Sequence, residues 1–175
     1  MYKKHRSHKD PNYISEDEEN GLRLQLLRAK MEKILREQFH KHLPVDPVHL
    51  YQHFFNHKKK LLDLKKKGKI TKEQFDLLLP TNFRVDSEKF DLSLLITLLF
   101  EFCGYKLPNP TWKPDESDRS EIANFVRFRI ARNKIQHGIV SVTEKEFDEI
   151  FESVKQPMLD FQCCLLYTSP SPRDA

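Results

Sequence analysis

Cysteine, glycine and long apolar segments are all scarce in this chain of 175 residues. Its three cysteines, Cys103, Cys163 and Cys164, include two neighbours and form no disulfide framework, which favours a reducing compartment. Its four glycines build no glycine-rich phosphate loop, which argues against nucleotide binding. No apolar run approaches the roughly 20 residues that span a bilayer, and no apolar stretch of a secretory signal follows the basic N-terminus. We therefore expect a cytoplasmic protein with no membrane contact.

The chain also lacks a large excess of charge of either sign. The chain has 30 Lys and Arg against 26 Asp and Glu, a net charge of +4, which is weak evidence for nucleic acid by itself. Charged residues make up 32% of the chain, so much of each helix must be solvated surface. The length permits one domain of ordinary size with a sizeable core.

Apolar residues recur at helical spacing through most of the chain, and no stretch shows the sustained alternation of a strand. The first four predicted helices cover residues 21–42, 46–67, 72–79 and 90–103. A fifth helix begins at Asp118 and Glu121 and ends at Gly138. The last helix follows the capping pair Thr143 and Glu146. Short connections join them. The sequence therefore predicts an all-α bundle of four to five main helices.

The two ends of the chain differ in composition from the predicted bundle. Residues 1–20 are polar and lack periodicity, which predicts a disordered leader. Residues 164–175 resemble the in-frame translation of a transposase sequencing adapter, so we expect an artefact tail there. The helical domain would then occupy residues 21–163, and unknown downstream domains of the same chain would be missing.

The most informative motif is Arg132-Asn133-Lys134-Ile135-Gln136-His137, followed by Gly138. An arginine binds phosphate through several N–H donors, and a histidine titrates near neutral pH. Together they suit cleavage of RNA without a metal. The same pair also occurs in proteins that only hold RNA or hold each other. A structural reading remains open, in which Arg132 bonds groups inside the bundle and His137 interacts with the helix dipole.

A helical projection at roughly 100° per residue places the motif on an apolar flank. The apolar arc contains Ile122, Phe125, Val126, Phe128, Ile130, Ile135 and Ile139, and within it fall Arg129, Arg132, Asn133, Gln136 and His137. Ser120, Ala123, Asn124, Arg127, Ala131 and Lys134 fall on the opposite, polar side. Buried polar groups need partners, so the polar residues of the arc would either satisfy one another inside the bundle or line a groove or a second subunit. Arg132 and His137 point roughly 140° apart, which favours a site at a two-fold interface.

Several ordered stretches resemble a known family. They are Ile70–Pro80, Phe90–Leu95, Trp112–Pro114, Asp118–Ser120, Ala123–Arg127 and the Arg-Asn-x-x-x-His motif itself. In this order they resemble the HEPN domains of the type found in the DAZ-interacting RING-finger ubiquitin ligase and in related animal multidomain proteins. The resemblance covers roughly residues 45–160, which makes it more specific than the short motif.

This resemblance implies a bundle of four or five helices, frequent dimerisation and, in active relatives, a metal-independent endoribonuclease. Carried onto this chain, His137 would act on the ribose 2′-hydroxyl or the leaving oxygen, Arg132 would stabilise the phosphate and Asn133 would orient either group. Arg129, Lys134 and Gln136 are candidates for RNA binding or for the interface. One departure is that Ile135 and Gln136 stand where relatives often have an aromatic residue. The expected partners are RNA and a second copy, with no cofactor; the alternative function is a catalytically silent dimerisation or scaffold domain.

Two weaker patterns lie on the second predicted helix. His49, His53 and His57 recur every four residues and could bind a metal, but no acidic or cysteine ligand accompanies them, so we expect a solvated face and no metal site. Lys58–Lys60 and Lys65–Lys67, followed by Lys69, could follow phosphates or could be ordinary solvated lysines.

Overall fold

The computed structural model describes residues 13–137 and 142–167, with side chains placed in 13–136 and 142–162. These residues form seven α-helices, one short 3₁₀-helix and no strand. The helices are α1 (Glu16–His40), α2 (Pro47–Asn56), α3 (Lys58–Lys66), α4 (Lys72–Leu78), η1 (Ser87–Lys89), α5 (Leu92–Phe102), α6 (Glu121–His137) and α7 (Glu144–Tyr167). The predicted all-α class is confirmed. No helix in these ranges is long and apolar enough to cross a membrane.

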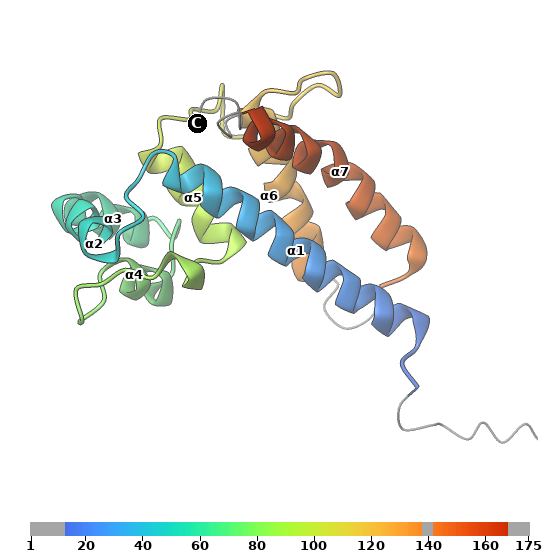
Figure 1. The fold of residues 1–175 in the computed structure, drawn as a ribbon, viewed down its shortest axis with the longest axis horizontal. Coiled ribbons are helices and arrows are strands. Elements are labelled where there is room, and N and C mark those ends of the chain that lie inside the picture. The colour runs from blue at the N-terminus through green and yellow to red at the C-terminus, as the bar shows by residue number, and fades with distance from the viewer. Residues whose placement is uncertain (1–12, 138–141, 168–175) are drawn as a thin grey trace, which may run out of the picture.

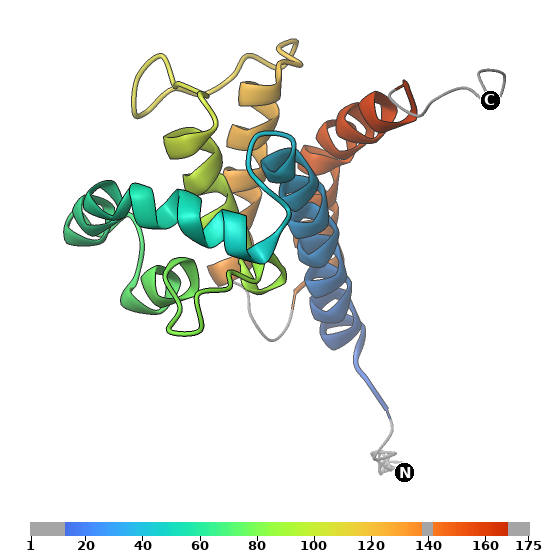
Figure 2. The same ribbon diagram turned by 60° about the vertical axis from the view of Figure 1, so that its left-hand side comes forward.

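Four of the helices, α1, α5, α6 and α7, pack together as the main bundle (Figure 1). Helix α1 contacts both α5 and α7, and α6 lies between α5 on one side and α1 and α7 on the other (Figure 2). The shorter helices α2, α3 and α4 form a separate group at one end of the bundle (Figure 1). This arrangement gives α6 neighbours on several sides, which determines where its polar side chains can lie.

Aromatic side chains hold the two groups of helices together. Phe39 of α1 packs against Phe54 of α2, with ring centroids 6.5 Å apart, and against Phe90, at 5.9 Å. In the main bundle, Phe161 of α7 stacks on Phe125 of α6 at 5.3 Å. All five rings are buried. Burying a large aromatic side chain is among the largest apolar contributions to folding, so these contacts fix how the helices meet.

Helix α1 begins earlier than the sequence predicted. Ser15 caps it: its side chain accepts the Glu18 N–H at 3.2 Å, and the Glu18 carboxylate accepts the Ser15 N–H at 2.9 Å. Asn20, within the predicted leader, is buried and donates to Glu144 at 3.2 Å. The prediction that residues 1–20 precede the bundle is therefore wrong at its C-terminal end, because a polar first turn carries no apolar periodicity. Residues 1–12 lie outside the described residues.

The predicted helix over residues 46–67 is two helices, α2 and α3. Asp46 and Pro47 begin α2 as predicted, the Asp46 carboxylate accepting the N–H groups of Val48 and His49 at 3.0 Å each. The helix then breaks at His57 (φ −109°, ψ 21°). The Nδ1 of His57 lies 2.8 Å from the His53 carbonyl oxygen, the group that a continuous helix would use for its own ladder.

Helix α7 begins at the predicted capping pair, with the Glu146 N–H donating to Thr143 Oγ1 at 3.2 Å. It continues to Tyr167, past residue 163, where the domain was expected to end. The first residues of the expected artefact tail therefore lie within a helix. Residues 168–175 lie outside the described residues, and the artefact origin of the tail stays a prediction.

Candidate functional site

Helix α6, which carries the motif, is buried around most of its circumference until its last turns. Ala123, Asn124 and Ala131 were predicted on a polar side, yet all three are buried. Phe125, Val126, Phe128 and Ile135 are buried as well. The predicted division into one apolar and one polar side is therefore wrong, because α1, α5 and α7 together cover both sides. A projection of one helix assumes one covered side.

The polar residues of the motif lie at the end of α6, where this cover ends. Asn133, Lys134 and Gln136 are exposed, and Arg132 is half-buried. Lys134 was predicted on the polar side, and its exposure agrees with that. The exposure of Asn133 and Gln136 contradicts the alternative in which the polar residues of the arc bond one another inside the bundle, and agrees with the one in which they line a groove or a second subunit. Residues on this side of α6 change from buried Phe125, through half-buried Arg129, to exposed Gln136 along the helix. The motif therefore has access to solvent and to a ligand.

Two of the three proposed catalytic residues are in contact. The Nη1 of Arg132 donates to Oδ1 of Asn133 at 3.1 Å. A guanidinium has five N–H donors, so this bond leaves most of them for a ligand. His137 is the last residue of α6, but its side chain and Gly138 lie outside the described residues. The structure thus places the arginine and the asparagine of the motif together.

Sequence reasoning missed a polar network at the other end of α6. Buried Asn124 donates through Nδ2 to Asp160 Oδ2 of α7 at 3.2 Å, and its Oδ1 accepts Arg127 Nη1 at 2.9 Å. Arg127 also donates through Nη2 to the Asp115 carbonyl at 2.9 Å. Arg119 forms an ion pair with Asp160, which lowers the pKa of that carboxyl. The network joins the loop before α6, α6 and α7, and so fixes the helix that carries the motif.

The start of α6 also differs from the prediction. Ser120, not Asp118, caps the helix, because Ser120 Oγ accepts the Ala123 N–H at 3.2 Å. Asp118 acts one step earlier: its carboxylate accepts the Ser120 N–H at 2.9 Å, and this bond lowers its pKa. These two successive hydrogen bonds link the loop to the first turn of α6.

The three histidines of α2 and its end have different surroundings. His49 is exposed and bonds Asp46 at 2.9 Å, whereas His53 is half-buried, with its ring centroid 5.8 Å from that of Phe102. Burial, with the nearby His57, lowers the pKa of His53. The prediction of a solvated face is therefore wrong for His53. Within the described residues, no three His, Cys, Asp or Glu side chains lie close enough together to hold a metal ion.

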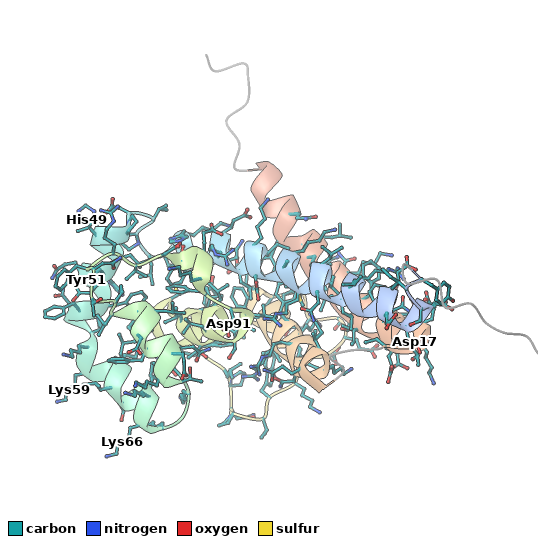
Figure 3. All side chains as sticks on the ribbon, turned by 90° about the horizontal axis from the view of Figure 1, so that it is seen from below. Asp17, His49, Tyr51, Lys59, Lys66 and Asp91 are labelled. Atoms are coloured by element: carbon teal, nitrogen blue, oxygen red, sulfur yellow. The ribbon has the colours of Figure 1, made fainter. Side chains whose placement is uncertain are left out.

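Some lysines of the lysine-rich segment, residues 58–69, form ion pairs with acidic side chains. Lys69 donates to Glu101 at 3.0 Å, and Lys67 pairs with Asp63 at 2.8 Å. Lys60 reaches the Glu101 carbonyl, which ties α3 to the end of α5. Lys59 and Lys66 are exposed and extend from the outer side of α3 (Figure 3). Only part of this segment is therefore available to an anionic ligand.

Comparison with known proteins agrees with the resemblance noted in the sequence. A model of the family described as DZIP3/hRUL138-like HEPN matches residues 47–164, which is more than half of the chain. The matched range is close to the predicted one and includes α2 to α6 and most of α7. No match was found among curated proteins or solved structures. The match to the family, together with the helical bundle and the motif at the end of α6, shows that the chain belongs to the DZIP3/hRUL138-like HEPN family.

Proposed function

We propose that this HEPN domain binds RNA at the C-terminal end of α6 and cleaves it without a metal ion, as a homodimer. The observation that carries the proposal is the half-buried Arg132, whose side chain makes its only hydrogen bond among the described residues to Asn133. Arginine in such a position offers a rigid set of donors to a phosphate. The bond to Asn133 uses one guanidinium donor and leaves the others available to a ligand.

The chemistry follows from the residue types. His137 accepts the proton of the ribose 2′-hydroxyl, the 2′-oxygen then bonds to the adjacent phosphorus, and the bond from phosphorus to the 5′-oxygen breaks. Arg132 stabilises the negative charge that builds on the phosphate oxygens. A proton returned by an imidazole completes the departure of the 5′-oxygen. Because residues five apart point roughly 140° apart on one helix, the second copy supplies the complementary group.

Incubation of the purified chain with labelled single-stranded and structured RNA in EDTA tests this proposal. We expect Arg132→Ala and His137→Ala to abolish cleavage while helical content is retained. Lys145→Ala is the matched control, because Lys145 is an exposed cation of α7. If the wild-type chain neither binds nor cleaves any of these RNAs, the proposal is wrong.

A second candidate is a silent dimerisation domain, and exposed leucines on α1 favour it. Leu22 is 56% exposed and Leu26 is 66% exposed, and residues four apart share a helix face. A second copy would cover this stripe. Mass measurement by size-exclusion chromatography with light scattering separates the candidates: a dimer that persists in His137→Ala with cleavage lost indicates catalysis. A dimer with no cleavage in any variant indicates a scaffold, and Leu22→Lys with Leu26→Lys should then yield monomers.

A further inference from the structure

A groove of about 530 Å³ lies beside the motif-bearing helix, between α5, the loop that follows it and α6. Its lining joins segments that are far apart in the sequence, among them Lys69 after α3, Lys106 in the loop and Arg129 of α6. The floor is the outward side of α5, including Thr97 and Phe100. The groove therefore exists only in the folded domain.

The charges around this groove are unbalanced in favour of cations. Lys69, Lys106 and Arg129 line it, and Glu101 is the one acid in the lining. Glu101 is already paired with Lys69 at 3.0 Å and with Lys60 at 3.8 Å. The side chains of Lys106 and Arg129 form no hydrogen bond or ion pair within the part of the chain that the structure describes. Two cations without an acidic partner, beside a neutralised acid, favour an anionic ligand.

The floor of the groove adds a flat apolar surface to these charges. Phe100 is half-buried and packs against Phe125 in a T-shaped arrangement, with ring centroids 6.3 Å apart and planes at 87°. The Arg129 guanidinium carbon lies 6.0 Å from the centre of the Phe100 ring. Cations beside an aromatic side chain are a combination that binds single-stranded nucleic acid, because phosphates meet the cations and bases stack on aromatic rings and guanidinium groups.

The groove also has a defined position relative to the motif. Arg129 precedes Arg132 and Asn133 by three and four residues, so the three side chains follow one another along one face of α6. A chain of phosphates that passes Arg129 is therefore led towards Arg132. The lysines of α3 lie on a different helix from the motif.

We propose that this groove binds the sugar-phosphate backbone of single-stranded RNA and delivers the next phosphate to Arg132 and Asn133. This inference rests on the proposed function and deepens it, because it assigns Lys106 and Arg129 as phosphate contacts outside the Arg-His motif. Single strands are favoured over duplexes because Phe100 is useful only to an unpaired base.

Fluorescence anisotropy with a labelled oligouridylate carrying 2′-O-methyl groups tests the groove, since this RNA can bind but cannot be cleaved through its 2′-oxygen. The test variant is Lys106→Ala with Arg129→Ala. The matched control is Lys145→Ala with Lys155→Ala, which removes the same charge from exposed positions of α7. We expect at least about tenfold weaker binding for the groove variant than for the control. The logarithmic salt dependence should also fall by about 0.7 per lost contact.

The outcomes separate this inference from the proposed function. If the groove variant binds like the control while Arg132→Ala with Asn133→Ala binds weakly, the groove assignment is overturned and the motif proposal stands. If both variants bind weakly, the groove and the motif form one binding surface, as proposed. If only the groove variant binds weakly, the groove binds RNA but does not lead it to Arg132 and Asn133, and the delivery of phosphate to the motif is overturned. If the wild type does not bind, both are wrong. If polyglutamate competes as well as unlabelled RNA, the groove recognises charge alone and the assignment to RNA is overturned.

Discussion

The N-terminal and C-terminal halves of α6 each carry an asparagine bonded to an arginine, but the two pairs differ in burial and in partners. Asn124 is 1% exposed, and Arg127 beside it is committed to the Asp115 and Asp118 carbonyls. Asn133 is exposed, and Arg132 bonds it alone within the described residues. The same residue types thus stabilise the fold at one end and remain available at the other. Burial, and not residue type, distinguishes a structural pair from a candidate site.

The largest expected effect comes from the buried side of α6. Phe128→Ala removes a fully buried ring that packs against Phe161, with centroids 5.7 Å apart. We expect a loss of about 3–5 kcal/mol in the free energy of unfolding, since a cavity replaces the ring. Urea unfolding followed by circular dichroism measures it. Exposed Gln136→Ala is the control, and a similar loss there would contradict the difference between the two halves.

The two asparagines give a smaller and more direct comparison. Asn124→Ala leaves the Asp160 carboxylate and the Arg127 guanidinium each short of a buried partner, so we expect a loss of about 1–3 kcal/mol in unfolding free energy. Asn133→Ala should change stability by less than about 0.5 kcal/mol. Urea unfolding of both variants measures the two losses. Equal losses would mean that Asn133 is as structural as Asn124.

The smallest expected effect is a pH dependence at the buried end. The Arg119 ion pair lowers the pKa of Asp160 below its ordinary value of 3.8, so the folded state holds fewer protons than the unfolded state in acid. The contribution of Asp160 is therefore complete above pH 3.8 and is lost as the pH falls through the lowered value. Asp160→Asn should be less stable than wild type at neutral pH, and the gap should narrow in acid. A gap independent of pH would show that the charge contributes nothing.

Local signals in the sequence predicted much of the fold. The capping pair Thr143 and Glu146 acts within one turn, so its residue types suffice to place the start of α7. The break at His57 was not predictable from periodicity, because it depends on a side chain that competes for a backbone carbonyl.

The site was less predictable than the fold for a physical reason. The motif residues were found from their types, but their exposure depends on three neighbouring helices. A projection of α6 alone placed Asn124 on a polar side, although it is buried. The groove joins residues 69, 106 and 129, which no local pattern connects. Such a site becomes visible only when the packing is known.

The carboxylate of Asp160 has a mechanical consequence for the motif. It bonds Asn124 of α6, Arg119 of the preceding loop and Gln156 of its own helix. The placement of α6 therefore depends on how α7 docks, although α7 supplies no residue to the proposed catalytic set. A partner that moves α7 would therefore also move the preceding loop and α6, and with them the position of Arg132.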